Sequence, residues 1–285
     1  MSMNKYVLLL LLLGACNSAK DENESSSAEE QDKVGLTQKD SVRLNSFISE
    51  AFKAPLHSKE HQQMLDSALA IQPDNAWLWQ QKAMPLYKAR KYQLGKPFLA
   101  KAVENDPEKY LDYSAFIKCI FSKDRIKSIT EFVQAKNDYG DSYIMDHTYN
   151  FYIGLDYLQL NEFEKAKEFL VLSKEQQFAD FPKDQPHKAC HYLDWFYLGI
   201  ADFELGNYQE AISSFDMSLK GYDLFADALY FKGRSMSKLG NLDEGAELEK
   251  LAFENGQNSI NEDSAIYEIY PYQVFHKLNE SVRPK

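Results

Sequence analysis

The sequence predicts an all-α fold in which helix-turn-helix units follow one another at intervals of 34 residues. Turn and packing residues recur at this interval: Gly199 and Gly233, Gly206 and Gly240, Pro73 and Pro107. Between these markers, apolar residues return at the spacing of amphipathic helices. Such self-similarity is typical of solenoids, in which each unit buries its apolar face against the next one.

The clearest unit is the stretch "DWFYLGIADFELGNYQEAISSFDMSLK". It contains W-x2-L-G ending at Gly199 and A-x3-F starting at Ala211, and we expect both small residues where its two helices approach closely. Gly206 stands between these helices, at a turn where positive φ costs glycine little. The pattern resembles the tetratricopeptide repeat, a helix-turn-helix unit of 34 residues.

The resemblance continues on both sides of this unit. Gly154 and Ala166 take the two small positions of the preceding unit, which is separated from it by 11 additional residues near "ADFPKDQPHKACH". Upstream, the two prolines close segments that end as second helices of this family do. In the last unit, Gly245 and Glu249 stand where alanine and an aromatic residue are usual, so we expect looser packing of its second helix.

The resemblance implies a right-handed superhelical solenoid of about six repeats. We place a signal peptide at 1–15, a flexible acidic tether at 16–37, the solenoid at 38–259 and a C-terminal cap or arm at 260–285. The tether is polar and acidic, and such composition cannot bury enough apolar surface to fold. The expected repeats lie near 42–75, 76–109, 110–146, 147–180, 192–225 and 226–259.

The N-terminus predicts a lipid anchor. The apolar run 6–13 is far shorter than the roughly 20 residues of a membrane-spanning helix and fits the core of a signal peptide. It ends in Leu13-Gly14-Ala15-Cys16, which resembles the bacterial lipobox. The resemblance implies cleavage before Cys16 and attachment of lipid, including palmitate, at that residue.

Two features after the cysteine bear on location. Asn17 replaces the Asp that often retains such lipoproteins in the inner membrane, which favours the outer membrane of a Gram-negative bacterium. Lys20-Asp21-Glu22 resembles a short signal for export to the cell surface, although a solvated linker has the same composition. We therefore expect an envelope protein that lies either on the periplasmic side of the membrane or on the cell surface.

Composition and motifs exclude several functions. The formal net charge of −11 opposes binding to nucleic acid, which needs a basic surface. The sequence contains no GxSxG, P-loop or HExxH motif, so we expect neither an enzyme nor a cofactor. His187, Cys190 and His191 share one helical face, but no fourth zinc ligand is marked, and we expect no metal. Cys119 and Cys190 are either free thiols or one disulfide.

We expect the protein to act through the concave surface of the solenoid, lined mainly by the first helix of each repeat. The partner would be another envelope protein or a peptide; the alternatives are a glycan-binding lipoprotein beside an outer-membrane transporter and a toxin-neutralising protein. The family positions that line this surface correspond here to Trp77, Gln80, Met84, Tyr87, Lys88, Lys118, Phe121, Phe151, Leu155, Phe196, Phe203, Tyr230, Arg234 and Lys238.

The C-terminal stretch after residue 259 carries no repeat pattern. Because a solenoid must cover its last apolar face, Ile266, Ile269, Tyr270 and Tyr272 are candidates for a capping segment. The alternative is an arm that docks on another protein.

Overall fold

The computed structural model describes residues 36–260 and 268–275. The predicted signal peptide, Cys16 and Lys20-Asp21-Glu22 lie outside the described residues, as does Ile266. The chain divides into two units, Met1–Thr37 and Gln38–Lys285, and the second contains every described helix. Within the described ranges, no helix combines the length and apolar character needed to cross a membrane.

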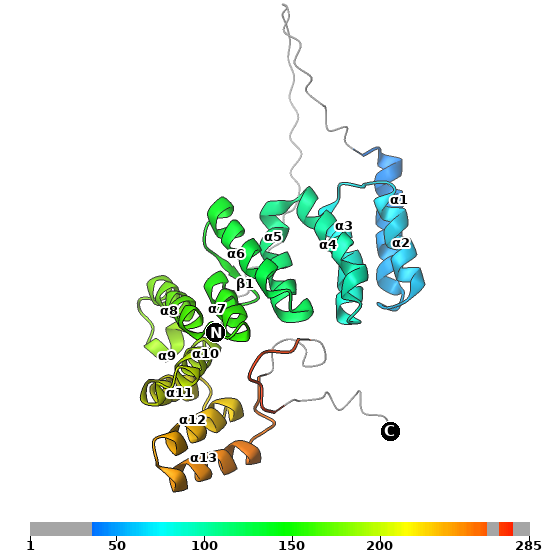
Figure 1. Cartoon of the computed structure of the whole chain (residues 1–285). Coiled ribbons are helices and arrows are strands. Elements are labelled where there is room, and N and C mark those ends of the chain that lie inside the picture. Colours follow the sequence, from blue (N-terminus) through cyan, green and yellow to red (C-terminus); the bar gives the residue numbers. More distant parts are fainter. Residues whose placement is uncertain (1–35, 261–267, 276–285) are drawn as a thin grey trace, which may run out of the picture. The chain divides into compact units, whose positions relative to one another are not determined.

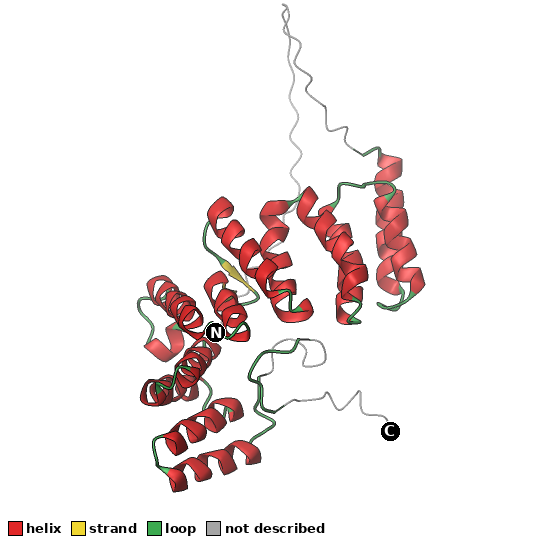
Figure 2. Ribbon diagram, in the orientation of Figure 1, coloured by secondary structure: helices red, strands yellow, loops and turns green. Residues whose placement is uncertain are grey.

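The second unit is built from six consecutive helix pairs, shown in Figures 1 and 2, and the all-α prediction is confirmed. We call the first helix of each pair the A helix and the second the B helix. The pairs are α1 (Gln38–Lys53) and α2 (Lys59–Leu69), α3 (Ala76–Lys88) and α4 (Tyr92–Asn105), α5 (Pro107–Ile117) and α6 (Arg125–Tyr139), α7 (Tyr149–Gln159) and α8 (Phe163–Asp180), α10 (Tyr192–Glu204) and α11 (Tyr208–Gly221), and α12 (Ala226–Lys238) and α13 (Leu242–Glu254).

The turns inside these pairs share one backbone feature. In five pairs, the residue two positions before the B helix has positive φ: Arg90, Lys123, Asn161, Gly206 and Gly240. The role predicted for Gly206 is confirmed, with φ of 77°. The three residues that are not glycine adopt the same left-handed conformation at a cost of about 1–2 kcal/mol each, so turn geometry dominates over residue preference here.

Glycine is required where paired helices touch. A Cβ on Gly199 would lie 2.6 Å from Cε1 of Phe215, so even alanine would displace the ring. The expectation of looser packing in the last pair is wrong. A Cβ on Gly233 would lie 2.7 Å from the backbone oxygen of Gly245, because two facing glycines let α12 and α13 approach backbone to backbone.

Three short elements interrupt the regular pairs. A π-helical turn, η1 (Lys118–Ser122), continues α5, and α9 (Pro186–Ala189) lies in the predicted insertion. Before α7, an antiparallel hairpin joins β1 (Tyr143–Ile144) to β2 (His147–Thr148). Its two turn residues, Met145 and Asp146, both have positive φ, as a two-residue hairpin turn requires.

Candidate binding surface of the A helices

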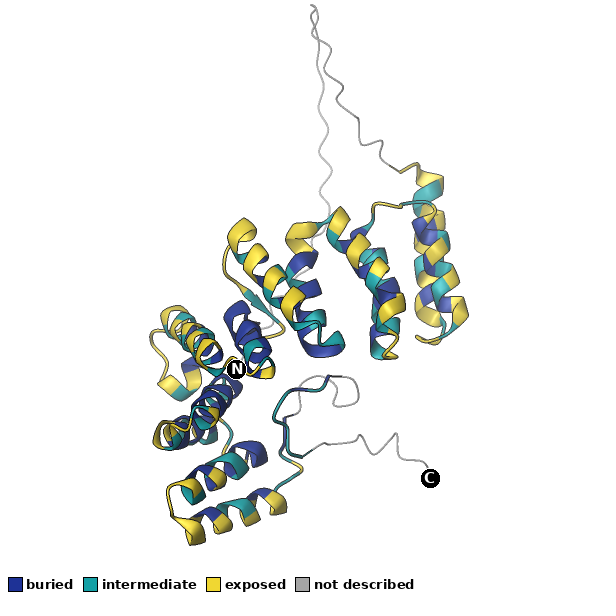
Figure 3. Cartoon of the chain, viewed as in Figure 1, coloured by how far each residue is buried: buried dark blue, intermediate teal, exposed yellow. Residues whose placement is uncertain are grey.

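Five residues predicted to line the binding surface are buried instead: Tyr87, Phe121, Phe151, Leu155 and Phe196. Each exposes at most 2% of its surface, so their assignment as lining residues is corrected. The physical reason is the enclosure of the A helices: Figure 3 shows α7 and α10 as buried along most of their length. An A helix contacts its own B helix and the neighbouring pairs, which leaves little of its surface exposed.

The other predicted residues reach the surface to different extents. Arg234 and Lys238 are exposed on α12. Lys118 forms an ion pair with Glu131 at 2.6 Å and is half-buried. The remaining half-buried residues of the set are Trp77, Gln80, Met84, Lys88, Phe203 and Tyr230.

A segment of the chain itself, residues 268–275, is bound by side chains from these helices and their turns. We call it the C-terminal segment; Figure 1 shows its red trace beside α12. Lys123 Nζ donates a hydrogen bond to the carbonyl of Ile269, and the Tyr197 hydroxyl donates to the carbonyl of Pro271 at 2.9 Å. The segment therefore connects the third pair to the fifth through its main chain.

The same segment is bound at the sixth pair by Asp227. One carboxylate oxygen accepts hydrogen bonds from the backbone N–H groups of Val274 and Phe275, at 2.6 and 3.4 Å. The other accepts from the Ser259 hydroxyl at 2.8 Å and the Ile260 N–H at 3.1 Å. Burial raises the pKa of this carboxyl, and the four hydrogen bonds oppose that effect.

Aromatic side chains of the segment fill the spaces between these polar contacts. Tyr270 is 4% exposed and belongs to the main hydrophobic core. Tyr272 packs against Phe231, with ring centroids 5.8 Å apart, and Phe275 packs edge-on against Phe253 at 5.3 Å. Phe275 thus covers the last pair, as predicted for a cap, whereas Ile269 and Pro271 reach earlier pairs of the same chain.

Lys123 is the lysine that contacts the C-terminal segment, and its environment disfavours the charged form of its amine. The pKa of its amine is lowered to about 8, chiefly by burial and also by nearby Arg125, against the opposing influence of Cys119 and Asp156. In the unfolded chain the amine titrates near 10.4. Between these two values the unfolded chain binds the proton and the folded chain does not, so folding stability contributed by Lys123 rises with pH.

We therefore expect wild type to gain stability relative to Lys123→Met between pH 8 and pH 10. The measurement is urea denaturation of both proteins at several pH values. The difference between their free energies of unfolding is compared across pH, because the contributions of other titrating groups cancel in that difference. Lys91→Met, at an exposed turn position, is the matched control and should show no such trend. A difference that stays constant with pH would contradict the burial of this amine.

His147, His191 and Asp194 are the described residues that come closest to a metal site, with one ligand atom from each lying within 4.8 Å of the others. The sequence spacing predicts a different group, in which His191 joins His187 and Cys190. Both ring nitrogens of His147 lack a hydrogen-bond partner, and its Nδ1 lies 3.6 Å from Asp194 Oδ2. Cys119 and Cys190 are separate buried thiols.

These three residues offer too few free ligand atoms for a zinc site. Nδ1 of His191 accepts a hydrogen bond from the Leu193 N–H at 3.3 Å, which caps the start of α10. A neutral imidazole that accepts at Nδ1 carries its proton on Nε2, so neither nitrogen offers a free lone pair. His147 and Asp194 then remain as two ligands, and a catalytic zinc site uses three from the protein.

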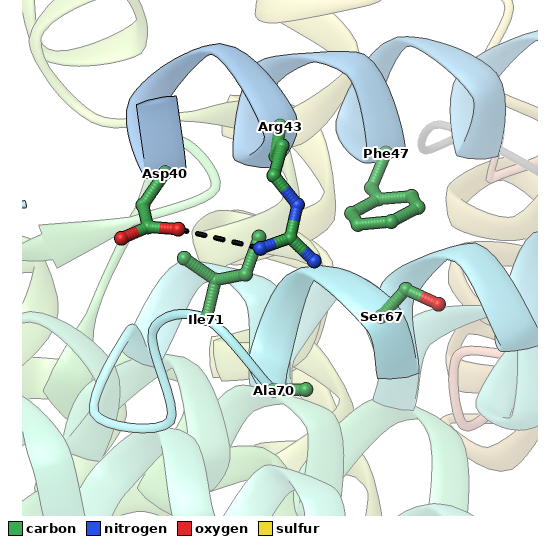
Figure 4. A pocket seen from close by; sticks show the side chains of 6 residues that line it. All are labelled: Asp40, Arg43, Phe47, Ser67, Ala70 and Ile71. Carbon is green, nitrogen blue, oxygen red and sulfur yellow. Dashed lines mark hydrogen bonds and ion pairs between the residues drawn. The ribbon is translucent and has the colours of Figure 1, made fainter. Parts of the chain in front are cut away.

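A surface pocket of about 420 Å³ lies between α1 and α2. Figure 4 shows Arg43 reaching over Ile71 toward Asp40, and the ion pair measures 3.4 Å. Both charged side chains are exposed, and exposed ion pairs contribute little to affinity or stability. The pocket thus lacks the buried polar groups that fix a small molecule in place.

Comparisons with known proteins concern the fold. No family model matches the sequence, and no curated protein matches it. Among solved structures, PilW, a widely conserved type IV pilus biogenesis factor, is 17% identical; the alignment covers 75% of this chain and 92% of PilW, with a TM-score of 0.56. PilF of Pseudomonas aeruginosa is 16% identical over 74% of this chain and 90% of its own, with a TM-score of 0.53.

A third solved structure carries the repeat in its description. A tetratricopeptide repeat protein from Parabacteroides merdae is 13% identical over 79% of this chain and 83% of its own, with a TM-score of 0.59. These likenesses agree with the six helix pairs and with the glycines at their turns and contacts. The chain is a helical solenoid with the tetratricopeptide-repeat fold.

Proposed function

We propose that this protein is a lipid-anchored interaction scaffold of the bacterial cell envelope. It binds a segment of another envelope protein on the surface formed by the A helices and the turns that follow them, which we call the A-helix surface. The supporting observation is that this surface binds the main chain of the C-terminal segment. Lys123, Tyr197 and Asp227 contact carbonyl or N–H groups, which every peptide presents regardless of its side chains. Such a surface suits peptide recognition.

The fold of PilW supports the same function by analogy, since that protein is a type IV pilus biogenesis factor. On α12, Asp227, Phe231, Arg234 and Lys238 follow one another at helical spacing, so the exposed cations continue the face that contacts the C-terminal segment. A partner segment that extends beyond this contact would meet them.

The test is site-specific photo-crosslinking in the native envelope. A photoreactive amino acid placed at Arg234 or Lys238 should crosslink to a membrane protein, because both positions are exposed on the proposed surface. The same amino acid at Ser213, exposed on the B helix α11, is the matched control and should yield no such product. Binding to polysaccharide without any crosslinked protein would overturn the scaffold in favour of glycan recognition.

The anchor is tested separately. Cys16→Ser removes the sulfur on which the lipid thioether forms, so we expect the protein to move from the membrane fraction to the soluble fraction. Cell fractionation with an antibody against the solenoid measures this, and Cys119→Ser is the control that changes a buried thiol away from the predicted lipobox. If the Cys16→Ser protein stays with membranes, the lipobox interpretation is wrong.

A further inference from the structure

We propose that the C-terminal segment is an internal ligand of the A-helix surface, and that the partner carries a similar segment which displaces it. This inference rests on the proposed function and specifies its partner. The chemistry to be matched is an acidic residue followed by two tyrosines that flank a proline, as in Glu268, Tyr270, Pro271 and Tyr272.

The position of the segment is the first argument. A cap is needed only where a solenoid ends, and Phe275 meets that need by packing against Tyr230 and Phe253 of the last pair. Ile269, in contrast, is bound by Lys123 of the third pair, 146 residues earlier in the sequence. The third to fifth pairs have neighbours on both sides, so capping does not account for a segment bound to them.

The polar contacts are the second argument. Pro271 lacks an N–H group and its carbonyl is bound by the Tyr197 hydroxyl, so proline at this point leaves no donor unpaired. Tyr197 has no exposed surface, so the packing around its ring holds the hydroxyl in place. The surface therefore binds the main chain of the segment, which turns at Pro271 and Tyr272, through polar atoms that are held in place by the core of the solenoid.

The side chains of the segment are the third argument. Tyr270 is almost fully buried, and Glu268 is buried as well, although carboxylates are rarely buried without compensation. Tyr272 is partly buried as well: burial and a hydrogen bond with Glu204 raise the pKa of its hydroxyl. Specific sites thus exist for an acidic residue and two tyrosines, and the same sites would select a partner.

An internal ligand lowers the apparent affinity for an external one by the fraction of molecules in which the surface is free. Weakening the internal segment should therefore strengthen binding of a partner segment without changing any residue of the solenoid. The direction of the change in affinity therefore separates the two roles. Loss of an internal competitor strengthens partner binding, whereas loss of a structural cap would destabilise the solenoid and weaken partner binding.

The experiment uses the full mature chain and a fluorescent peptide with the sequence of residues 268–275. Tyr270→Asp places a charge in an apolar site and should release the segment, and Tyr272→Ala is a milder second variant at a half-buried position. Fluorescence anisotropy should show the peptide binding both variants at least about tenfold more tightly than wild type. Adding Tyr197→Phe, which removes only the hydroxyl, should reverse part of that gain.

Controls make each outcome decisive. Tyr139→Asp, at a position 44% exposed on α6, should leave peptide binding at the wild-type level. Hydrogen exchange at the amides of Val274 and Phe275 reports whether the segment has been released. Faster exchange without tighter peptide binding would overturn the proposal, and unchanged exchange would show that the two tyrosines do not hold the segment, which also overturns it. If the peptide behaves as expected but Arg234 crosslinks to no envelope protein, the proposed function fails and the internal ligand stands.

Discussion

Replacing Phe196 by alanine should lower the free energy of unfolding by about 3–5 kcal/mol, as expected for the truncation of a fully buried phenylalanine. Its side chain has no exposed surface. The ring lies between neighbouring pairs, with its centroid 4.9 Å from that of Tyr197 and 5.1 Å from that of Phe225. Urea denaturation followed by circular dichroism measures the loss.

The matched control is Phe181→Ala, which makes the same truncation at a position 48% exposed just after α8. It should change stability by no more than about 0.5 kcal/mol. If Phe196→Ala proved as mild as this control, Phe196 would belong to the binding surface after all. The expected large loss means that reduced partner binding by this variant reports unfolding and cannot be used to map the surface.

The repeat architecture could be predicted because it depends on local requirements that recur. Gly206 and Gly240 mark turns that need positive φ, and Gly199 marks a contact with no space for a Cβ. Such requirements act within one pair, so each leaves a trace at the 34-residue interval. Where a turn uses Arg90 or Asn161 instead of glycine, the same geometry leaves no trace in the sequence.

The binding surface could not be predicted in the same way. Apolar residues on an A helix face either the core or the surface, and the helical period does not separate these directions when both sides of the helix are packed. Phe151 and Phe203 are both predicted to line the surface, yet Phe151 is fully buried and Phe203 is half-buried. Only the arrangement of three neighbouring pairs decides between them.

The C-terminal segment shows a second limit. Its contacts with Lys123 and Tyr197 join residues far apart in the sequence and follow no period. Its aromatic residues predict burial, but not which helix pairs the segment reaches. The proximity of His147 and His191 could not be predicted either. Their ring centroids lie 4.7 Å apart because the hairpin before α7 places one ring and the cap of α10 places the other, and no spacing rule connects these two elements.

Asp227→Ala should release the C-terminal segment and lower the free energy of unfolding by about 2–4 kcal/mol, because it leaves hydrogen-bond donors without an acceptor. The carboxylate is fully buried and accepts from Ser259, Ile260, Val274 and Phe275. It therefore connects α12 both to the end of the last repeat and to the segment. Hydrogen exchange should become faster at Val274 and Phe275 before any change appears in the helices of the first pairs.

Asp223→Ala is the matched control, since this exposed carboxylate lies in the turn just before α12. It should change neither exchange nor stability measurably. Two outcomes would contradict the role of Asp227: a loss of stability with exchange at the segment unchanged, or faster exchange spread evenly over all pairs. The expected pattern, release confined to the last pair and the segment, would show that one buried carboxylate couples the end of the solenoid to the occupancy of its binding surface.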